Sequence, residues 1–183
     1  DQTGDAGTTV VSPGRTPAIE VRGSNRSRLL LKNGLIVDGT GQAAYPGDLL
    51  INDGKIEAVT PGEIEFSGET IDCAGRVIAP GFIDVHSHMD WVLPARSHHE
   101  LKTPFTAQGI TTFVTGNCGY GVAGFRRNSR FREILESKTG GLYPLAWDTM
   151  EGYFTHLEQQ GITHNLANLA GHGTTRASIR GFE

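Results

Sequence analysis

The chain has 183 residues, of which 37% are hydrophobic, enough for one domain with a buried core or for one domain and part of another. The formal net charge of −4 gives no reason to expect nucleic acid or an acidic membrane surface as a partner. No apolar run approaches the ~20 residues that cross a bilayer, so we expect no membrane partner.

The two cysteines, Cys73 and Cys118, lie too far apart in the sequence to suggest a disulfide framework. A reduced, cytoplasmic protein is therefore the simpler interpretation. The sequence begins at Asp1 rather than at methionine, which leaves open an exported protein whose signal has been removed. Nothing in the sequence indicates the oligomeric state.

The amino-acid composition of the N-terminal part of the chain changes near residue 28. Residues 1–27 are rich in Gly, Thr, Ser and Pro, which predicts a flexible leader. Residues 28–78 contain short β-type runs between turn signals and predict a small antiparallel sheet. The turn signals are Asn33-Gly34, Asp38-Gly39 and Asp53-Gly54.

From residue 79 onward, strand and helix patterns alternate, which predicts a parallel β/α architecture. The expected strands are the run Ala79–His88, then Ile110–Thr115 and Asn165–Ala170. Helices are expected at Thr103–Gln108, around Phe131–Leu135, and from Met150, where an apolar stripe at helical spacing continues to Leu157.

The first of these strands ends in two histidines, His86 and His88, spaced i, i+2. In a strand this spacing points both imidazoles to one side, and two neighbouring neutral imidazoles are half of a metal site. By spacing alone, an ordinary polar strand end is as good an explanation. Asp90 is either a carboxylate that orients one of the imidazoles or a turn residue.

The other two strands are also followed by side chains that can bind a metal or a ligand. The second is followed by Gly116-Asn117-Cys118-Gly119, and the third by a segment from Gly171 to Arg176 that contains His172. The C-terminal ends of parallel strands open at one edge, so three such endings with flanking glycines predict a binding site. Cys118 is either an inert core residue or a thiolate ligand, and thiolate with imidazole selects Zn²⁺ over Mg²⁺ or Ca²⁺.

These segments resemble the amidohydrolase superfamily, and the resemblance covers about residues 28–183. Three blocks, Lys32–Gly41, Asp53–Ile56 and Ala79–His88, look like those of amidohydrolases in general. Two later blocks, Gln108–Gly119 and Asn165–Arg176, are similar to the N-acyl-D-amino-acid deacylases, or D-aminoacylases.

The resemblance implies a (β/α)8 barrel with a small β-sandwich. Residues 28–78 would then be the N-terminal part of the sandwich, and residues 79–183 the first three strands of the barrel. The resemblance makes His86 and His88 the metal-ligand pair of the first barrel strand. It makes Cys118 the thiolate ligand that this branch uses in place of the carboxylated lysine of hydantoinases. The full-length enzyme would bind one or two Zn²⁺ ions. For His172 and Arg176 the resemblance implies a structural role and a contact with substrate equally.

The implied reaction is deacylation of an N-acyl-D-amino acid to a carboxylate and a free D-amino acid. The attacking group would be a zinc-bound water whose pKa falls from 15.7 to about 7. A complete barrel takes about 250 residues, so the later histidine ligands and the aspartate general base have no counterpart here. We expect an N-terminal fragment that binds zinc weakly and does not turn over substrate alone.

Two alternatives stay open. A cyclic amidase of the hydantoinase or dihydropyrimidinase type shares the His-x-His start, but it is not expected to carry Asn117-Cys118-Gly119 after the second strand. A non-catalytic remnant or interaction module that retains the sandwich is the other alternative, and metal analysis would distinguish it from an enzyme.

Overall fold

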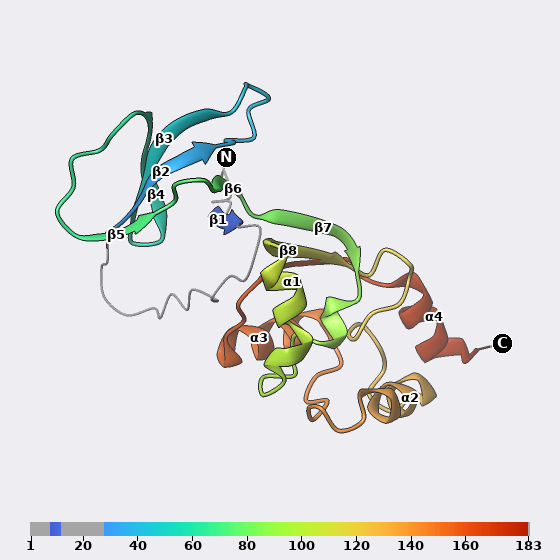
Figure 1. The fold of residues 1–183 in the computed structure, drawn as a ribbon. Helices are drawn as coiled ribbons and strands as arrows, with labels where there is room; N and C mark the ends of the chain where they lie inside the picture. The colour runs from blue at the N-terminus through green and yellow to red at the C-terminus, as the bar shows by residue number, and fades with distance from the viewer. Residues whose placement is uncertain (1–7, 12–27, 183) are drawn as a thin grey trace. The chain divides into compact units, whose positions relative to one another are not determined.

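The computed structural model describes residues 8–11 and 28–182, and they form two compact units (Figure 1). The first unit comprises the described residues up to Gly81 together with Ala107–Gly109. The second comprises Phe82–Thr106 and the described residues from Ile110 onward. In the part of the chain that the structure describes, no helix has both the length and the apolar character needed to cross a membrane.

The first unit is a six-stranded sheet in the order β1-β6-β2-β3-β4, with β5 also paired to β2. Its strands are β1 (Thr8–Val11), β2 (Leu29–Ile36), β3 (Tyr45–Asn52), β4 (Lys55–Pro61), β5 (Glu69–Asp72) and β6 (Val77–Pro80). Strand β1 comes from the segment predicted to be a flexible leader, and it pairs antiparallel with β6. The rest of that segment lies outside the described residues.

The prediction of a purely antiparallel sheet is wrong. Strands β2, β3 and β4 are antiparallel neighbours, but β5 and β6 both run parallel to β2. Turn signals in a sequence reveal only hairpin partners, whereas parallel partners lie far apart along the chain. The hairpin at Asp53-Gly54 is confirmed, with φ of 52° and 75° at its two residues.

Asn33-Gly34 is not a turn between two strands, as the sequence suggested, but an irregularity inside β2. The register with β3 shifts between Leu31 and Gly34, and Asn33 has φ of 62°. The backbone N–H of Asn33 donates to Oδ1 of the buried Asp48 at 2.8 Å. The Asn-Gly pair therefore allows a bulge whose freed N–H group is satisfied by a side chain.

The second unit contains three parallel strands in the order β7-β8-β9, which are β7 (Phe82–Ser87), β8 (Ile110–Thr115) and β9 (Asn165–Asn168). This confirms the predicted parallel β/α architecture. The run Ala79–His88 is divided at Gly81 between β6 and β7. Ser87 lies opposite Thr115, and Thr115 opposite Asn168, so the three strands end together at one edge.

Four α-helices and two 3-10 turns connect or follow these strands. They are η1 (Met89–Trp91), η2 (His99–Leu101), α1 (Thr103–Ala107), α2 (Arg130–Thr139), α3 (Met150–Gln160) and α4 (His172–Arg180). The first three α-helices confirm the helices predicted from the sequence. Helix α4 was not among the predicted helices: the segment from Gly171 to Arg176, which follows the third strand, is the start of a helix.

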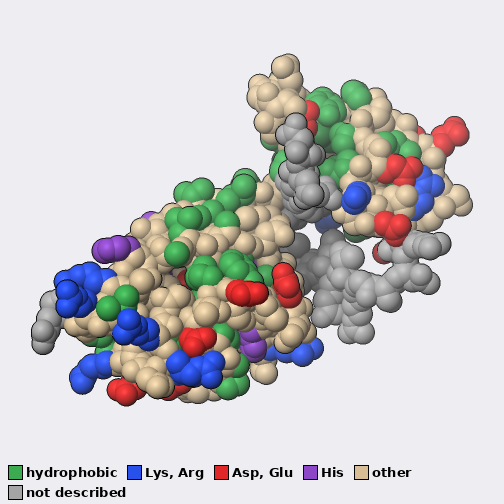
Figure 2. Space-filling model, turned by 180° about the vertical axis from the view of Figure 1, so that it is seen from behind, with side chains coloured by type: hydrophobic (Ala, Val, Ile, Leu, Met, Phe, Trp, Pro, Cys, Tyr) green, Lys and Arg blue, Asp and Glu red, His purple; other side chains and the backbone are tan. Residues whose placement is uncertain are grey.

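The core of the second unit lies between the sheet and the helices. Phe113 of β8 is fully buried and meets Phe105 of α1 edge-on at 5.4 Å, while Tyr153 and Leu157 of α3 join the same cluster. Figure 1 shows α1 and α3 on the same side of the strands. Apolar side chains also gather on the surface of this unit in Figure 2, and the structure leaves several residues of β7 exposed.

His164, just before β9, makes the stability of this core depend on pH. Its Nε2 pairs with the Thr106 hydroxyl at 3.1 Å, and its ring lies 5.0 Å from that of Phe113. Burial, followed by the positive charge of Lys102, lowers the pKa of His164 below its usual 6.5. The folded state thus disfavours the imidazolium, and stability present above pH 6.5 is lost as the pH falls through the lowered pKa.

We predict that His164→Gln reduces this loss. Between pH 7.5 and 5.5 the free energy of unfolding should fall more in the parent protein than in the variant, as measured by urea denaturation. Other titrating groups are common to both proteins, so the difference between them isolates His164. Equal pH dependence in the two proteins would contradict the prediction.

Candidate metal centre

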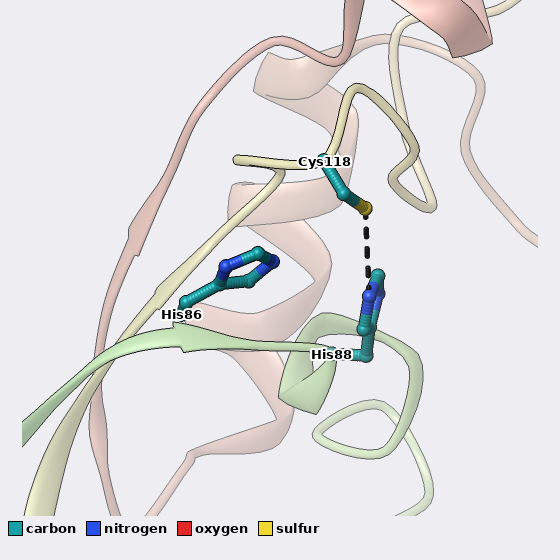
Figure 3. Close-up of side chains that lie close together, drawn as sticks. All are labelled: His86, His88 and Cys118. Carbon is teal, nitrogen blue, oxygen red and sulfur yellow. Dashed lines mark hydrogen bonds between the residues drawn. The ribbon is translucent and has the colours of Figure 1, made fainter.

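His86 and His88 stand at the C-terminal end of β7. The strand ends at Ser87, and His88 begins the turn that becomes η1. The alternation of side chains along extended backbone places both imidazoles on the same side, with ring centroids 6.2 Å apart. Figure 3 shows both rings facing the space below Cys118.

Cys118 comes from the turn that follows β8. Gly116 leaves the strand with φ of 84°, and the N–H of Gly119 closes the turn on the carbonyl of Gly116 at 3.0 Å. The side-chain amide of Asn117 donates to the carbonyl of Val85 in β7 at 3.1 Å. This bond ties the turn of Cys118 directly to the strand that carries the histidines.

The three side chains lie close enough together to approach one ion. The ligand atoms of His86, His88 and Cys118 lie within 4.8 Å of one another, and Cys118 Sγ is 3.5 Å from His88 Nε2. Zn–N bonds of about 2.05 Å and Zn–S bonds of about 2.3 Å in a tetrahedral site separate N from S by about 3.5 Å. The donor set of two imidazoles and one thiolate suits zinc better than a hard cation.

Among the residues that the structure describes, this is the one group of three or more histidine, cysteine or acidic side chains placed to hold a metal. All three side chains are exposed, so an ion reaches them from solvent. Three protein ligands leave positions for water or substrate, as catalytic zinc sites do.

Asp90 is not a member of this cluster. It belongs to η1, is fully buried, and its carboxylate oxygens make no hydrogen bond of ordinary geometry to a described residue. Burial raises the pKa of Asp90 to about 7, and the backbone N–H groups of Val122, Asp90 and Trp91 oppose this only in part. The structure thus shows a core carboxyl group rather than one bonded to an imidazole.

His172 and Arg176 lie on α4, outside the three-residue cluster. His172 is the first residue of the helix, and both side chains are exposed. The structure therefore brings together the side chains of His86, His88 and Cys118, and the other three predicted residues are not members of this cluster.

The turn after His88 is held by two tyrosines, of which Tyr153 belongs to the apolar stripe from Met150 to Leu157 and Tyr143 was not considered in the sequence. The hydroxyl of Tyr153 in α3 donates to the carbonyl of Asp90, and that of Tyr143 to the carbonyl of Trp91, each at 3.0 Å. Both rings are buried. The available signal was a tyrosine rather than a phenylalanine in an apolar stripe, since a buried hydroxyl requires a partner.

The sequence and the fold of this chain match those of known proteins. Residues 69–180 match the model of the amidohydrolase family. The chain belongs to this family. The family predicted from the sequence motifs is thereby confirmed.

Amidohydrolase relatives of the D-aminoacylase branch match most of this chain. The D-aminoacylase of Alcaligenes xylosoxydans xylosoxydans is 32% identical over 151 residues, which are 82% of this chain and 30% of that protein. A solved D-aminoacylase with a binuclear metal centre is 31% identical with a TM-score of 0.68, over 82% of this chain and 31% of that one.

A third relative was solved with a metal and an inhibitor. It is the N-acyl-D-glutamate deacylase of Bordetella bronchiseptica, complexed with zinc and a phosphonate that mimics the tetrahedral intermediate. It is 32% identical with a TM-score of 0.64, over 85% of this chain and 31% of that one. The described units thus have the fold of a β-rich segment and a partial barrel, and the chain spans about a third of the length of these relatives.

We predict that Tyr153→Phe lowers the free energy of unfolding by about 1–2 kcal/mol, because the buried carbonyl of Asp90 loses its donor. Tyr120→Phe is the matched control, since the side chain of Tyr120 is 43% exposed and should tolerate the same change within about 0.5 kcal/mol. Chemical denaturation measures both. An equal, small effect at the two positions would show that the Tyr153 hydroxyl does not stabilise the turn.

Proposed function

We propose that this chain carries the first metal ligands of a zinc-dependent hydrolase that deacylates N-acyl-D-amino acids to a carboxylate and a D-amino acid. The observation that carries the proposal is the convergence of His86, His88 and Cys118 at the ends of two neighbouring parallel strands. Membership of the amidohydrolase family supports the reaction class. The similarity to deacylases of D-amino-acid derivatives supports the substrate class.

Each ligand has a defined part in this proposal. His86 and His88 bind as neutral imidazoles and Cys118 as a thiolate, so binding releases a proton from the thiol at neutral pH. When bound, zinc supplies a Lewis acid for the amide carbonyl and makes water nucleophilic near pH 7. Asn117 keeps the thiolate beside the imidazoles through its bond to Val85.

The rest of the reaction needs groups that this chain does not supply. Because the chain spans about a third of the length of its relatives, we assign the general base and the recognition of the D-amino-acid side chain to residues outside it. The 183 residues alone should bind zinc weakly and not turn over substrate. His172 and Arg176 remain predicted substrate or structural contacts.

Metal analysis of the full-length protein tests the site. We predict that the parent protein binds zinc and that His86→Ala/His88→Ala and Cys118→Ala bind it at least tenfold more weakly, because each change removes coordinating atoms. His98→Ala is the control, since the His98 side chain pairs with Glu100 outside the cluster. Equal zinc content and affinity in all of these proteins would exclude the proposed site.

Turnover by the full-length protein tests the reaction. N-acetyl-D-amino acids should be hydrolysed in preference to their L-enantiomers and to hydantoins, and a chelator should abolish the activity until zinc is restored. Cys118→Ala should lower kcat/KM by about 100-fold or more. Preferential opening of hydantoins would favour a cyclic amidase instead, and zinc binding without any amide hydrolysis would favour a non-catalytic role.

A further inference from the structure

We propose that Thr174, on α4, is a positioning residue for the metal ligand Cys118. The inference rests on the proposed zinc site and adds a residue that is not one of its three ligands. Thr174 acts through the backbone of the turn in which Cys118 stands, and its contacts with that turn are the evidence.

The Thr174 side chain is fully buried and makes two hydrogen bonds to Gly121, in the segment that leaves the turn of Cys118. Its hydroxyl oxygen accepts from the N–H of Gly121 at 2.8 Å, and the same hydroxyl donates to the carbonyl of Gly121 at 3.1 Å. Both polar groups of Gly121, three residues after Cys118, are therefore bonded to one side chain. A hydroxyl is both donor and acceptor, so threonine can satisfy both groups, whereas valine can satisfy neither.

The backbone of Thr174 holds the turn at a second point. Its N–H donates to the carbonyl of Gly119, the residue directly after Cys118, at 3.0 Å. The first N–H groups of a helix have no partner within the helix, and here one of them is bonded to the ligand turn. Thr174 thus contacts the chain one residue and three residues beyond Cys118.

Two glycines explain how α4 approaches so closely. A Cβ added to Gly171 would lie 2.6 Å from the carbonyl oxygen of Gly119, and one added to Gly173 would lie 2.9 Å from the same atom. Such distances to backbone cannot be relieved by a side-chain rotation. The start of α4 is therefore packed directly against the backbone that follows Cys118, with no side chain between them.

The Cys118 side chain is exposed, and its Sγ lies 3.5 Å from His88 Nε2. Its position therefore depends on the backbone of the turn that carries it. Within the turn, Asn117 is bonded to β7, and the segment Gly119–Gly121 that leaves the turn is bonded to Thr174. Loss of the Thr174 hydroxyl leaves Gly121 without its buried partner, and Sγ then moves more freely relative to the imidazoles.

Thr175 provides a matched control on the same helix. Its hydroxyl donates to the carbonyl of Gly124 at 3.2 Å, six residues after Cys118, and its side chain is exposed. Thr175→Val makes the same chemical change as Thr174→Val, at a neighbouring position that contacts a different part of the chain. Thr174→Ser retains the hydroxyl and serves as the conservative variant.

The experiment makes two measurements on the full-length protein. Chelator competition gives the zinc affinity, and the absorption spectrum of the cobalt-substituted protein reports on the cysteine ligand through its thiolate-to-cobalt charge-transfer band. We expect Thr174→Val to weaken zinc binding by about tenfold or more and to diminish the thiolate band, because displacement of a supporting group typically costs 10–100-fold in affinity. Thr174→Ser and Thr175→Val should stay within about threefold of the parent protein.

A double-mutant cycle separates positioning of the thiolate from a general effect on folding. In a Cys118→Ser background, Thr174→Val should change zinc affinity by less than about threefold, because the ligand on which it acts is absent. An undiminished loss in that background, or parent-like affinity of Thr174→Val, would overturn the proposal. Thr174→Ala, which removes the same hydroxyl and leaves room for water, repeats the test if the valine variant does not fold.

The remaining outcomes are also decisive. If neither Thr174→Val nor Thr174→Ala folds while Thr174→Ser does, the hydroxyl serves the fold as a whole and the proposal fails. If the parent protein binds no zinc, the proposed metal site itself fails. Zinc binding that depends on Cys118 but not on Thr174 would refute the positioning role and leave the metal site intact.

Discussion

The parallel pairing of β7 with β8 is the constraint on which the candidate site depends. With Ser87 opposite Thr115, the histidines at the end of one strand and the cysteine after the next emerge at the same edge. A shift of the register by one residue would turn each side chain of the strand to the opposite face. Backbone hydrogen bonding between two strands therefore decides whether three distant residues can share one ion.

Two of the three proposed ligands, His88 and Cys118, stand on turns beyond the strands, and helices secure those turns. Helix α3 bonds the turn after His88 through Tyr153, and α4 bonds the turn after Cys118 through Thr174. In both cases a buried hydroxyl meets a backbone group, so each helix contributes polar bonds as well as apolar area. The helices are thus part of the support of the site, and they are not only its covering.

Much of this arrangement could be predicted from the sequence because it follows from local patterns. The strands at Ile110 and Asn165 and the stripe from Met150 to Leu157 are periodic, and the glycine-flanked Cys118 directly follows a β-branched run. Together with the His-x-His spacing, these patterns made His86, His88 and Cys118 candidates, and the resemblance to amidohydrolases made them the expected metal ligands. The structure brings the three side chains together.

The features that were missed depend on contacts between distant segments. Gly171 and Gly173 favour a loop by their intrinsic propensity, but close packing on Gly119 lets a helix begin there. The parallel partners of β2 carry no hairpin signal. The burial of Asp90 depends on the packing of η1, which the spacing to His88 does not encode.

The bond of Asn117 to Val85 and the contact of Cys118 with His88 span only about thirty residues of sequence. The three side chains of the candidate site and both of these contacts lie between Val85 and Cys118. One strand, the connection that follows it and the next strand with its turn therefore contain every side chain of the group.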